Sequence, residues 1–265
     1  MPRFAQQGVK FAAISYDSKE ILKFFGDRYK IEYSMLGDPD SKVIRAYGVL
    51  NEEATGMQKG FARPGYFFID PNGIIREKFF EARYRERLTG NSIIAKLFPE
   101  LGQEVTDTVE APHLQVAFEQ SDKTGFPGTH LTFAAAVSLP ADVHVYAPGA
   151  QGYKPIKLAL DPIPELELKP AVYPAAQTLY LAAIKERAPV LEGNFRISQD
   201  VKISSSSEFW GSIPKEGKAL TISGKLEYQA CDKTMCYLPT SVPVKWQVQV
   251  FRLDRVRAPV EIRHK

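Results

Sequence analysis

The sequence predicts an α/β domain followed by an all-β domain, and three observations support this fold class. The chain has 265 residues, enough for about two domains at roughly 150 residues each. Up to about residue 100, short apolar runs alternate with helical patterns, whereas beyond residue 112 apolar and polar residues alternate with period two. The segment between them is polar, acidic and bounded by prolines. We therefore expect domains at 1–100 and 113–254, joined by a linker at 101–112.

The composition excludes several classes of function. Hydrophobic residues make up 44% and charged residues 25%, as in an ordinary globular protein. A net charge of +3 is too small to indicate a nucleic-acid partner. Apolar runs all fall short of the roughly 18 residues that span a bilayer, and the opening MPRFAQQGVK lacks the apolar core of a signal peptide. We expect neither a membrane span nor an export signal in the chain as written.

The first domain is expected to run strand, helix, strand, helix, hairpin, helix. Its signals are an apolar strand at Val9–Ser15, a capping box at Asp17 and Glu20, a helix from Asp38 and Pro39 to Gly48, a hairpin of Gly65–Asp70 and Ile74–Phe80, and a helix at Asn91–Phe98. This order is that of a truncated thioredoxin-like domain that lacks its first strand and first helix.

The residues of the first domain carry a resemblance to a known family. Over residues 4–98 the chain resembles the second half of redoxin or AhpC/TSA-type peroxiredoxins, in the segments GVKFAAISYDS, LGDPDSKVIRAYGVL and PGYFFIDPNGIIREKFF. The resemblance places Pro64 where thioredoxin-like folds carry a cis-proline. It places the reactive cysteine on a helix upstream of Phe4, so we expect Met1 to be a late start or to follow a deletion. Residues 1–230 hold no cysteine, and we expect no peroxidase chemistry from this domain.

The second domain is predicted to be an immunoglobulin-like antiparallel β-sandwich. Three segments alternate apolar and polar residues, the pattern of strands with one buried face: Leu191–Ile197, Ile222–Gln229 and Val242–Val250. Turns rich in proline and glycine separate such strands, as in sandwiches of this class.

The two cysteines of the chain, Cys231 and Cys236, are separated by four residues. In a helix their side chains would point roughly 140° apart, and in an extended strand they would lie about 17 Å apart. A four-residue hairpin loop instead brings cross-strand Cα atoms to about 4.5–5.5 Å, which permits a disulfide. Because strands are expected on both sides, we predict that the two cysteines can be bridged.

Two interpretations of this pair stay open on the residues alone: a local staple or two free thiols, and an exchange-active disulfide. A loop of about six residues contributes only roughly 2 kcal/mol of stability. Cys231 is also an even number of residues from Lys225 and Glu227, so a continuous strand would place it on the same polar face. This parity predicts an exposed Cys231 sulfur that is open to exchange.

A second resemblance favours exchange. Residues 112–252 resemble the N-terminal periplasmic domain of DsbD-type thiol:disulfide interchange proteins, most clearly in LTISGKLEYQACDKTMCYLPTSVPVKWQVQV. The resemblance implies that Cys236 forms the mixed disulfide and that Cys231 resolves it. It places His144 and Tyr146 near the cysteine hairpin, where they either line the sulfurs or form an ordinary half-buried strand pair. It also implies a periplasmic or other extracytoplasmic location and a partner that is a thioredoxin-like protein or a membrane electron donor. Some members of that family have five residues between the cysteines, whereas this chain has four.

The sequence predicts neither a metal nor a cofactor. His113, His130 and His264 stand alone without zinc-ligand spacing, and there is no glycine-rich phosphate loop. Three functions remain: a thiol–disulfide oxidoreductase module using Cys231 and Cys236, a peroxiredoxin-like antioxidant protein, and a non-enzymatic sandwich that binds a partner and keeps a structural disulfide.

Overall fold

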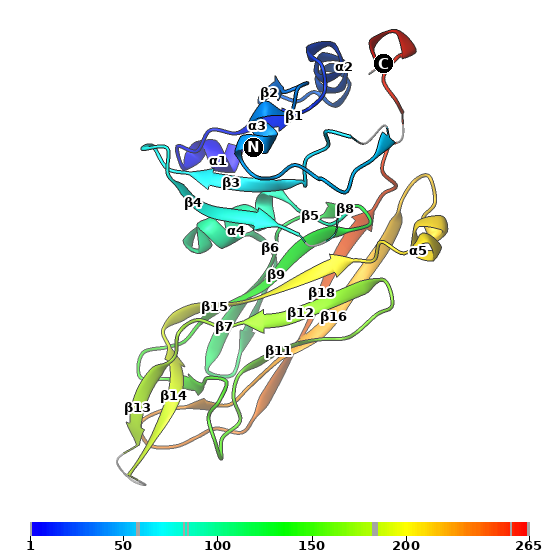
Figure 1. The fold of residues 1–265 in the computed structure, drawn as a ribbon. Helices are drawn as coiled ribbons and strands as arrows, with labels where there is room; N and C mark the ends of the chain where they lie inside the picture. The colour runs from blue at the N-terminus through cyan, green and yellow to red at the C-terminus, as the bar shows by residue number, and fades with distance from the viewer. Residues whose placement is uncertain are drawn as a thin grey trace. The chain divides into compact units, whose positions relative to one another are not determined.

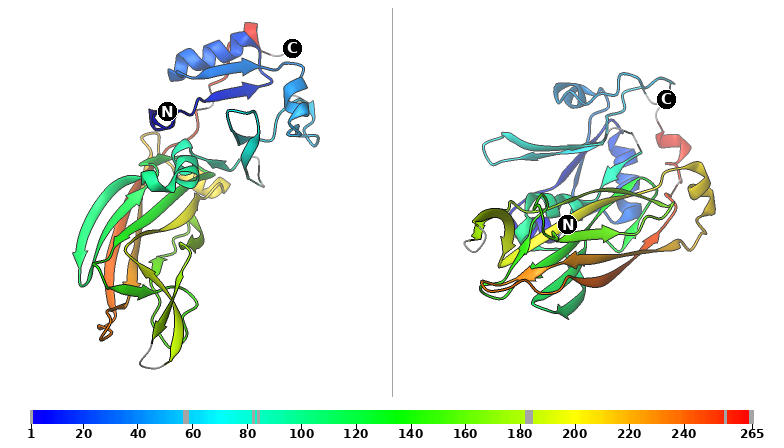
Figure 2. Two further views of the ribbon diagram at one scale, coloured as in Figure 1. Left: turned by 90° about the vertical axis from the view of Figure 1, so that its left-hand side faces the viewer. Right: turned by 90° about the horizontal axis from the view of Figure 1, so that it is seen from below.

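The computed structural model describes residues 2–56, 59–81, 83, 85–181, 185–254 and 256–263. The chain divides into two compact units (Figures 1 and 2), unit 1 at Met1–Arg87 and Leu253–Lys265 and unit 2 at Leu88–Arg252. Among the described residues, no helix is both long enough and apolar enough to span a membrane.

Unit 1 is an α/β unit with small sheets. Its elements are α1 (Pro2–Gln6), β1 (Ala12–Ser15), α2 (Lys19–Tyr29), β2 (Ser34–Gly37), α3 (Lys42–Ala46), β3 (Gly65–Ile69), β4 (Ile75–Phe80) and η3 (Val260–Ile262). Strands β1 and β2 pair in parallel, with α2 as the crossover between them, and β3 and β4 form an antiparallel hairpin. Such a strand–helix–strand order agrees with the expected thioredoxin-like region.

The helix starts in unit 1 lie slightly later than the sequence predicted. Ser18 caps α2 by accepting a hydrogen bond from the Ile21 amide. Asp17 was the expected cap, but its carboxylate instead accepts a hydrogen bond from the Ser15 hydroxyl at 2.5 Å. Helix α3 begins at Lys42, although the buried carboxylate of Asp38 does bind its first turn, accepting from the amides of Lys42 and Ile44 at 2.9 Å each. Short polar side chains therefore fix both starts, as expected of N-terminal caps.

The C-terminal segment belongs to unit 1 and not to the second domain. Asp254 accepts hydrogen bonds from Arg28 Nη2 at 2.6 Å and from the Tyr29 hydroxyl at 2.6 Å, both at the end of α2. These two donors hold the pKa of Asp254 at about 2, below its ordinary value. The chain after Arg252 therefore belongs to the first unit.

Unit 2 is built from mainly antiparallel sheets, with β8 added in parallel to β18. The chain enters it through β5 (Arg87–Leu88). Its further elements are α4 (Gly90–Leu97), η2 (Pro99–Leu101), β6 (Glu104–Ala111), β7 (Leu114–Gln120), β8 (Thr124–Gly125), β9 (Thr129–Ser138), β10 (His144–Tyr146), β11 (Lys157–Leu160), β12 (Leu166–Val172), β13 (Gln177–Leu181), β14 (Glu186–Glu192), β15 (Asn194–Ile203), α5 (Ser207–Ser212), β16 (Lys218–Tyr228), β17 (Ala230–Cys231) and β18 (Thr240–Val250). The long sheets run β12-β15-β9-β7-β6 and β11-β16-β18-β8, and a third runs β13-β14-β10-β17.

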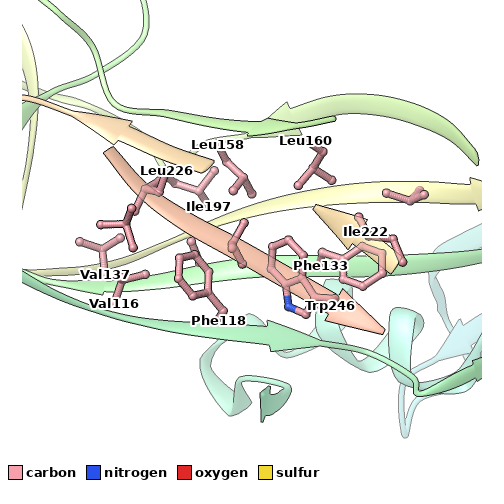
Figure 3. Packing of buried hydrophobic residues seen from close by; sticks show 14 of the residues in the cluster. Val116, Phe118, Phe133, Val137, Leu158, Leu160, Ile197, Ile222, Leu226 and Trp246 are labelled. Atoms are coloured by element: carbon pink, nitrogen blue, oxygen red, sulfur yellow. The ribbon is translucent and has the colours of Figure 1, made fainter. Parts of the chain in front are cut away.

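The two long sheets share one apolar core (Figure 3). Trp246 of β18 is 1% exposed, and its ring contacts Phe118 of β7 and Phe133 of β9, which lie in the other sheet. Along β18 every second residue from Val242 to Val250 is buried, which confirms the alternation predicted from the sequence. Apolar side chains of both sheets thus point toward one another and bury a common interior.

Residues 88–112 were expected to form the last helix of the first domain and a linker, but in the structure they belong to unit 2. Helix α4 packs against β9 of unit 2, and 104–111 form β6, which pairs with β7 along its length. The buried carboxylate of Glu119 holds this entry segment by accepting hydrogen bonds from the Gln103 amide and from Arg196. The polar composition that suggested a linker belongs to a largely exposed edge strand.

The alternation from Leu191 to Ile197 contains a turn. Gly193, with φ of 64°, separates β14 from β15, and these two strands belong to different sheets. The alternation predicted one strand because a tight turn can preserve the period of two on both sides. Glycine adopts a positive φ at little cost, so this residue marks the turn.

We predict that Trp246→Ala lowers the free energy of unfolding of unit 2 by about 3–5 kcal/mol, because it removes a buried indole that joins the two sheets. Urea denaturation followed by far-ultraviolet circular dichroism measures the loss. Lys245→Ala is the matched control, since Lys245 is the exposed neighbour on the same strand and should change stability by less than about 0.5 kcal/mol. Equal losses in both variants would contradict the packing assigned to Trp246.

Candidate functional site

Cys231 and Cys236 form a disulfide at the edge of the third sheet. The two sulfurs are 2.03 Å apart and the Cα atoms 4.0 Å apart. Cys231 ends β17, the edge strand that pairs with β10 in the register His144↔Cys231. Cys231 and Cys236 also face each other as an isolated antiparallel bridge. The four residues between them therefore form the tight hairpin loop that the spacing predicted.

The two cysteines differ in exposure. Cys231 is 1% exposed and packs in a small apolar cluster with Tyr146 and Val190, whereas Cys236 is exposed. The prediction from strand parity, that Cys231 is the exposed cysteine, was wrong. Strand β16 ends at Tyr228, Gln229 lies outside any strand, and β17 joins a different sheet. The alternation of β16 therefore does not continue to Cys231.

Asp232 organises the loop between the cysteines. One carboxylate oxygen accepts hydrogen bonds from the amides of Thr234 at 2.7 Å and Met235 at 2.8 Å, and from the Thr234 hydroxyl at 2.7 Å. The other oxygen accepts a hydrogen bond from the Tyr237 hydroxyl at 2.5 Å. The Tyr237 bond is the largest of the effects that hold the pKa of Asp232 well below its ordinary value. The sequence contained a signal for this role that we missed, because Asp followed two residues later by Thr favours a turn of this kind.

Tyr237 anchors the far side of the loop. Its amide donates to the Ala230 carbonyl at 2.9 Å, and its own carbonyl accepts from the Gln229 side chain at 2.9 Å. Its ring stacks on the imidazole of His113, with centroids 3.5 Å apart. The turn between β6 and β7 thus supports the cysteine loop through His113, one of the histidines that the sequence had left without a role.

Tyr146 contacts the exposed cysteine. Its hydroxyl lies 3.7 Å from Cys236 Sγ, and its ring stacks on Tyr153 with centroids 4.0 Å apart. Burial is the main cause that raises the pKa of Tyr146 above its ordinary value of 10.0, so the hydroxyl keeps its proton at neutral pH. It can therefore donate a hydrogen bond to sulfur. Tyr153 was not predicted from the sequence, since it lies in the loop after β10 without a periodic pattern.

His144 lies beside the buried cysteine. It pairs with Cys231 across β10 and β17, it is 5% exposed, and its ring meets that of Tyr146 edge-on at 5.6 Å. Burial lowers its pKa below the ordinary value of 6.5, and the nearby carboxylates of Glu192 and Asp232 oppose that shift. The structure thus brings His144, Tyr146 and both cysteines together.

Pro64 belongs to unit 1, whereas the two cysteines belong to unit 2. It precedes β3 in unit 1, and no peptide bond among the described residues is cis, so the cis-proline expected there is absent. Of the other histidines named from the sequence, His130 is a buried residue of β9, and His264 lies outside the described residues.

The loop also exposes apolar side chains next to Cys236. Met235 is 56% exposed and Leu238 is 86% exposed. Cys236 is an exposed residue, and a thiolate of another molecule that attacked its sulfur would break the bond to Cys231. The arrangement can therefore undergo thiol–disulfide exchange without opening the main core.

Comparison with known proteins matches residues 1–78 to the AhpC/TSA family. Alkyl hydroperoxide reductase C of Staphylococcus epidermidis is 35% identical over 78 residues, which are 28% of this chain and 39% of the relative. The same protein of Staphylococcus haemolyticus is 37% identical over 73 residues, which are 26% of this chain and 36% of the relative. The chain thus spans about two fifths of the length of these relatives, and the resemblance of its first part to the family is confirmed.

Solved structures also match part of the chain. The N-terminal periplasmic domain of ScsB from Proteus mirabilis has a TM-score of 0.38 and 12% identity, covering 53% of this chain and 49% of its own. The reduced DsbD N-terminal domain of Neisseria meningitidis has a TM-score of 0.30 and 13% identity, covering 44% of this chain and 77% of its own.

We predict that Asp232→Asn makes the disulfide severalfold easier to reduce. The asparagine side chain has one acceptor oxygen, and its amide nitrogen cannot accept a hydrogen bond from the Tyr237 hydroxyl. The loop of the reduced chain therefore holds the two thiols together less well. Because the pKa of Asp232 is lowered, the carboxylate stabilises the disulfide fully above about pH 5. This stabilisation is lost only as the pH falls below the usual aspartate range near pH 4.

Equilibration with dithiothreitol buffers, followed by alkylation and mass spectrometry, measures the effect. Asp142→Asn is the control, because Asp142 forms only an exposed ion pair with Lys233 at 2.5 Å. An unchanged disulfide equilibrium in Asp232→Asn would contradict the role assigned to this carboxylate.

Proposed function

We propose that the chain is a thiol–disulfide exchange module in which Cys236 meets the partner and Cys231 resolves the mixed disulfide. The observation that supports this proposal most strongly is the asymmetry of the pair, one sulfur exposed on a loop and the other buried at a sheet edge. Attack requires access to one sulfur, and resolution requires a second thiol held beside it.

Exchange at this site transfers two electrons. A partner thiolate attacks Cys236 Sγ, the Cys231–Cys236 bond breaks, and Cys231 leaves with the electron pair and takes up a proton. The second partner thiol, once deprotonated, then attacks the partner sulfur of the mixed disulfide and releases Cys236 as a thiolate. The chain gains two thiols as the partner gains a disulfide, and the reverse sequence donates electrons to an oxidised partner.

The environment of the disulfide supports exchange over reinforcement. A loop of about six residues restricts the unfolded chain much less than a long-range bridge does. Cys231 packs in its own small cluster, apart from the main core that the two long sheets share. Breaking the bond therefore leaves the residues that hold unit 2 together in contact.

The proposed partner is a thiol–disulfide protein, either thioredoxin-like or a membrane electron donor. The proposed location is the periplasm or another extracytoplasmic compartment, because disulfides persist where the surroundings are oxidising. The proposed fold of unit 2 is an immunoglobulin-like sandwich, which two long, mainly antiparallel sheets around one core support.

A peroxiredoxin-like function is the second candidate, favoured by the AhpC/TSA match of residues 1–78. A peroxidase of that kind needs a thiolate that attacks the peroxide. Residues 1–230 of this chain contain no cysteine, so the thiolate would have to come from Cys231 or Cys236.

We predict that Cys231→Ser traps mixed disulfides through Cys236, because the exposed thiol still reacts but nothing resolves the product. Incubation with oxidised glutathione and intact-mass measurement should show one adduct per chain. Cys236→Ser is the matched variant and should form far fewer adducts, since Cys231 is buried. If both variants react equally, or if neither reacts while folded, the disulfide is a staple and the third function replaces the first.

We further predict that the double variant Cys231→Ser/Cys236→Ser consumes no alkyl hydroperoxide in the presence of a thiol reductant. The reason is that it retains no thiol at all. A peroxide assay with the unchanged chain as reference measures this. Turnover that persisted in the double variant would show that unit 1 reduces peroxides by a route without cysteine.

A further inference from the structure

A buried imidazole faces the resolving cysteine with one nitrogen unused. His144 Nε2 is buried and has no hydrogen-bond partner among the described residues. Buried polar atoms are normally paired, so each exception calls for an explanation. His144 lies directly opposite Cys231 in the β10–β17 register, and side chains in such pairs have Cβ atoms about 4.5–5.5 Å apart.

The two side chains share one face of the sheet. Tyr146 lies two residues after His144 on β10, and alternate residues of a strand point to the same side. Tyr146 and Cys231 pack in one cluster, and the His144 ring contacts the Tyr146 ring. His144 therefore lies next to the thiol that Cys231 becomes when the disulfide is reduced.

That thiol needs a proton acceptor. Resolution requires the Cys231 thiolate, but burial among apolar groups raises the pKa of a thiol and keeps it protonated. Tyr146 cannot accept the proton at neutral pH because it holds its own. A neutral imidazole has a free acceptor nitrogen and can take the proton.

We propose that His144 accepts the Cys231 proton when Cys231 attacks the mixed disulfide at Cys236, an inference that rests on the proposed exchange function. In this step the Cys231 S–H bond breaks and its proton moves to the imidazole. The Cys231–Cys236 bond forms, and the bond between Cys236 and the partner sulfur breaks. The partner leaves as a thiolate with the electron pair, and in the reverse reaction the imidazolium returns the proton to Cys231.

The groups around His144 are consistent with this role. Glu192 lies opposite it on β14 and Asp232 on the cysteine loop, while Tyr146 and Cys231 are its neighbours on β10 and β17. Both carboxylates stabilise an imidazolium once it forms, whereas burial keeps the resting ring neutral. The nearby charges of Asp142 and Lys233 offset each other in an ion pair.

The test uses the full chain, reduced and mixed with the disulfide reagent dithionitrobenzoate. Cys236 attack releases one thionitrobenzoate, and Cys231 attack on the resulting mixed disulfide releases a second. In the unchanged chain the rate of the second release should stay nearly constant between about pH 6.5 and pH 8, because the imidazole is already unprotonated. In His144→Gln that release should be about 100-fold slower at pH 7 and should climb about tenfold per pH unit.

Controls separate proton transfer from packing. His113→Asn removes the other imidazole near the loop. It removes the stacking on Tyr237 and can slow both releases, but the second release should keep its flat pH profile. The proposal is overturned if the rate of the second release in His144→Gln stays constant with pH. This holds both when that rate equals the rate of the unchanged chain and when both releases are slowed by the same factor. If His144→Gln does not fold, the unchanged chain provides the test. A rate of second release that rises tenfold per pH unit in the unchanged chain also overturns the proposal. An unchanged chain that releases no thionitrobenzoate while folded refutes the exchange function itself.

Discussion

The accessibility of both sulfurs depends on one change of sheet at Gln229. Strand β16 pairs with β18 and its last residue, Tyr228, is fixed by a hydrogen bond from its hydroxyl to the Pro112 carbonyl. After Gln229 the chain pairs with β10 instead. This change turns Cys231 into the small cluster around Tyr146 and leaves Cys236 on the return side of the loop, in solvent. A continuous β16 would have carried Cys231 outward.

The loop is ordered by polar contacts that do not include the disulfide. Asp232 binds the loop amides, and Tyr237 joins this carboxylate to the stacked His113. These contacts can persist when the sulfur–sulfur bond breaks, so the two thiols stay near each other and the bond can form again. Cys231 lies in a small cluster separate from the main core, whereas Tyr237 of the loop packs against that core. On the proposed function, the molecule combines a stable scaffold with a bond that opens locally.

Sequence reasoning succeeded where the signal was local and periodic. The alternation of β18, the β3–β4 hairpin and the cysteine spacing all predicted features that the structure contains. It failed where tertiary pairing decided the outcome. Parity could not reveal that β17 joins another sheet, and composition could not distinguish a linker from the polar edge strand β6. Partners such as Tyr153 and His113 lie far from the cysteines in sequence, so no short-range pattern could assign them to the site.

The central claim is that the Cys231–Cys236 bond opens while the chain stays folded. Equilibration against glutathione redox buffers tests this most directly, with thiols counted by alkylation and the fold followed in parallel by circular dichroism. The account predicts complete reduction with the spectrum of the folded chain retained, at a potential above the roughly −300 mV below which structural disulfides of secreted proteins typically lie. A bond that is reduced only when the chain unfolds would contradict it.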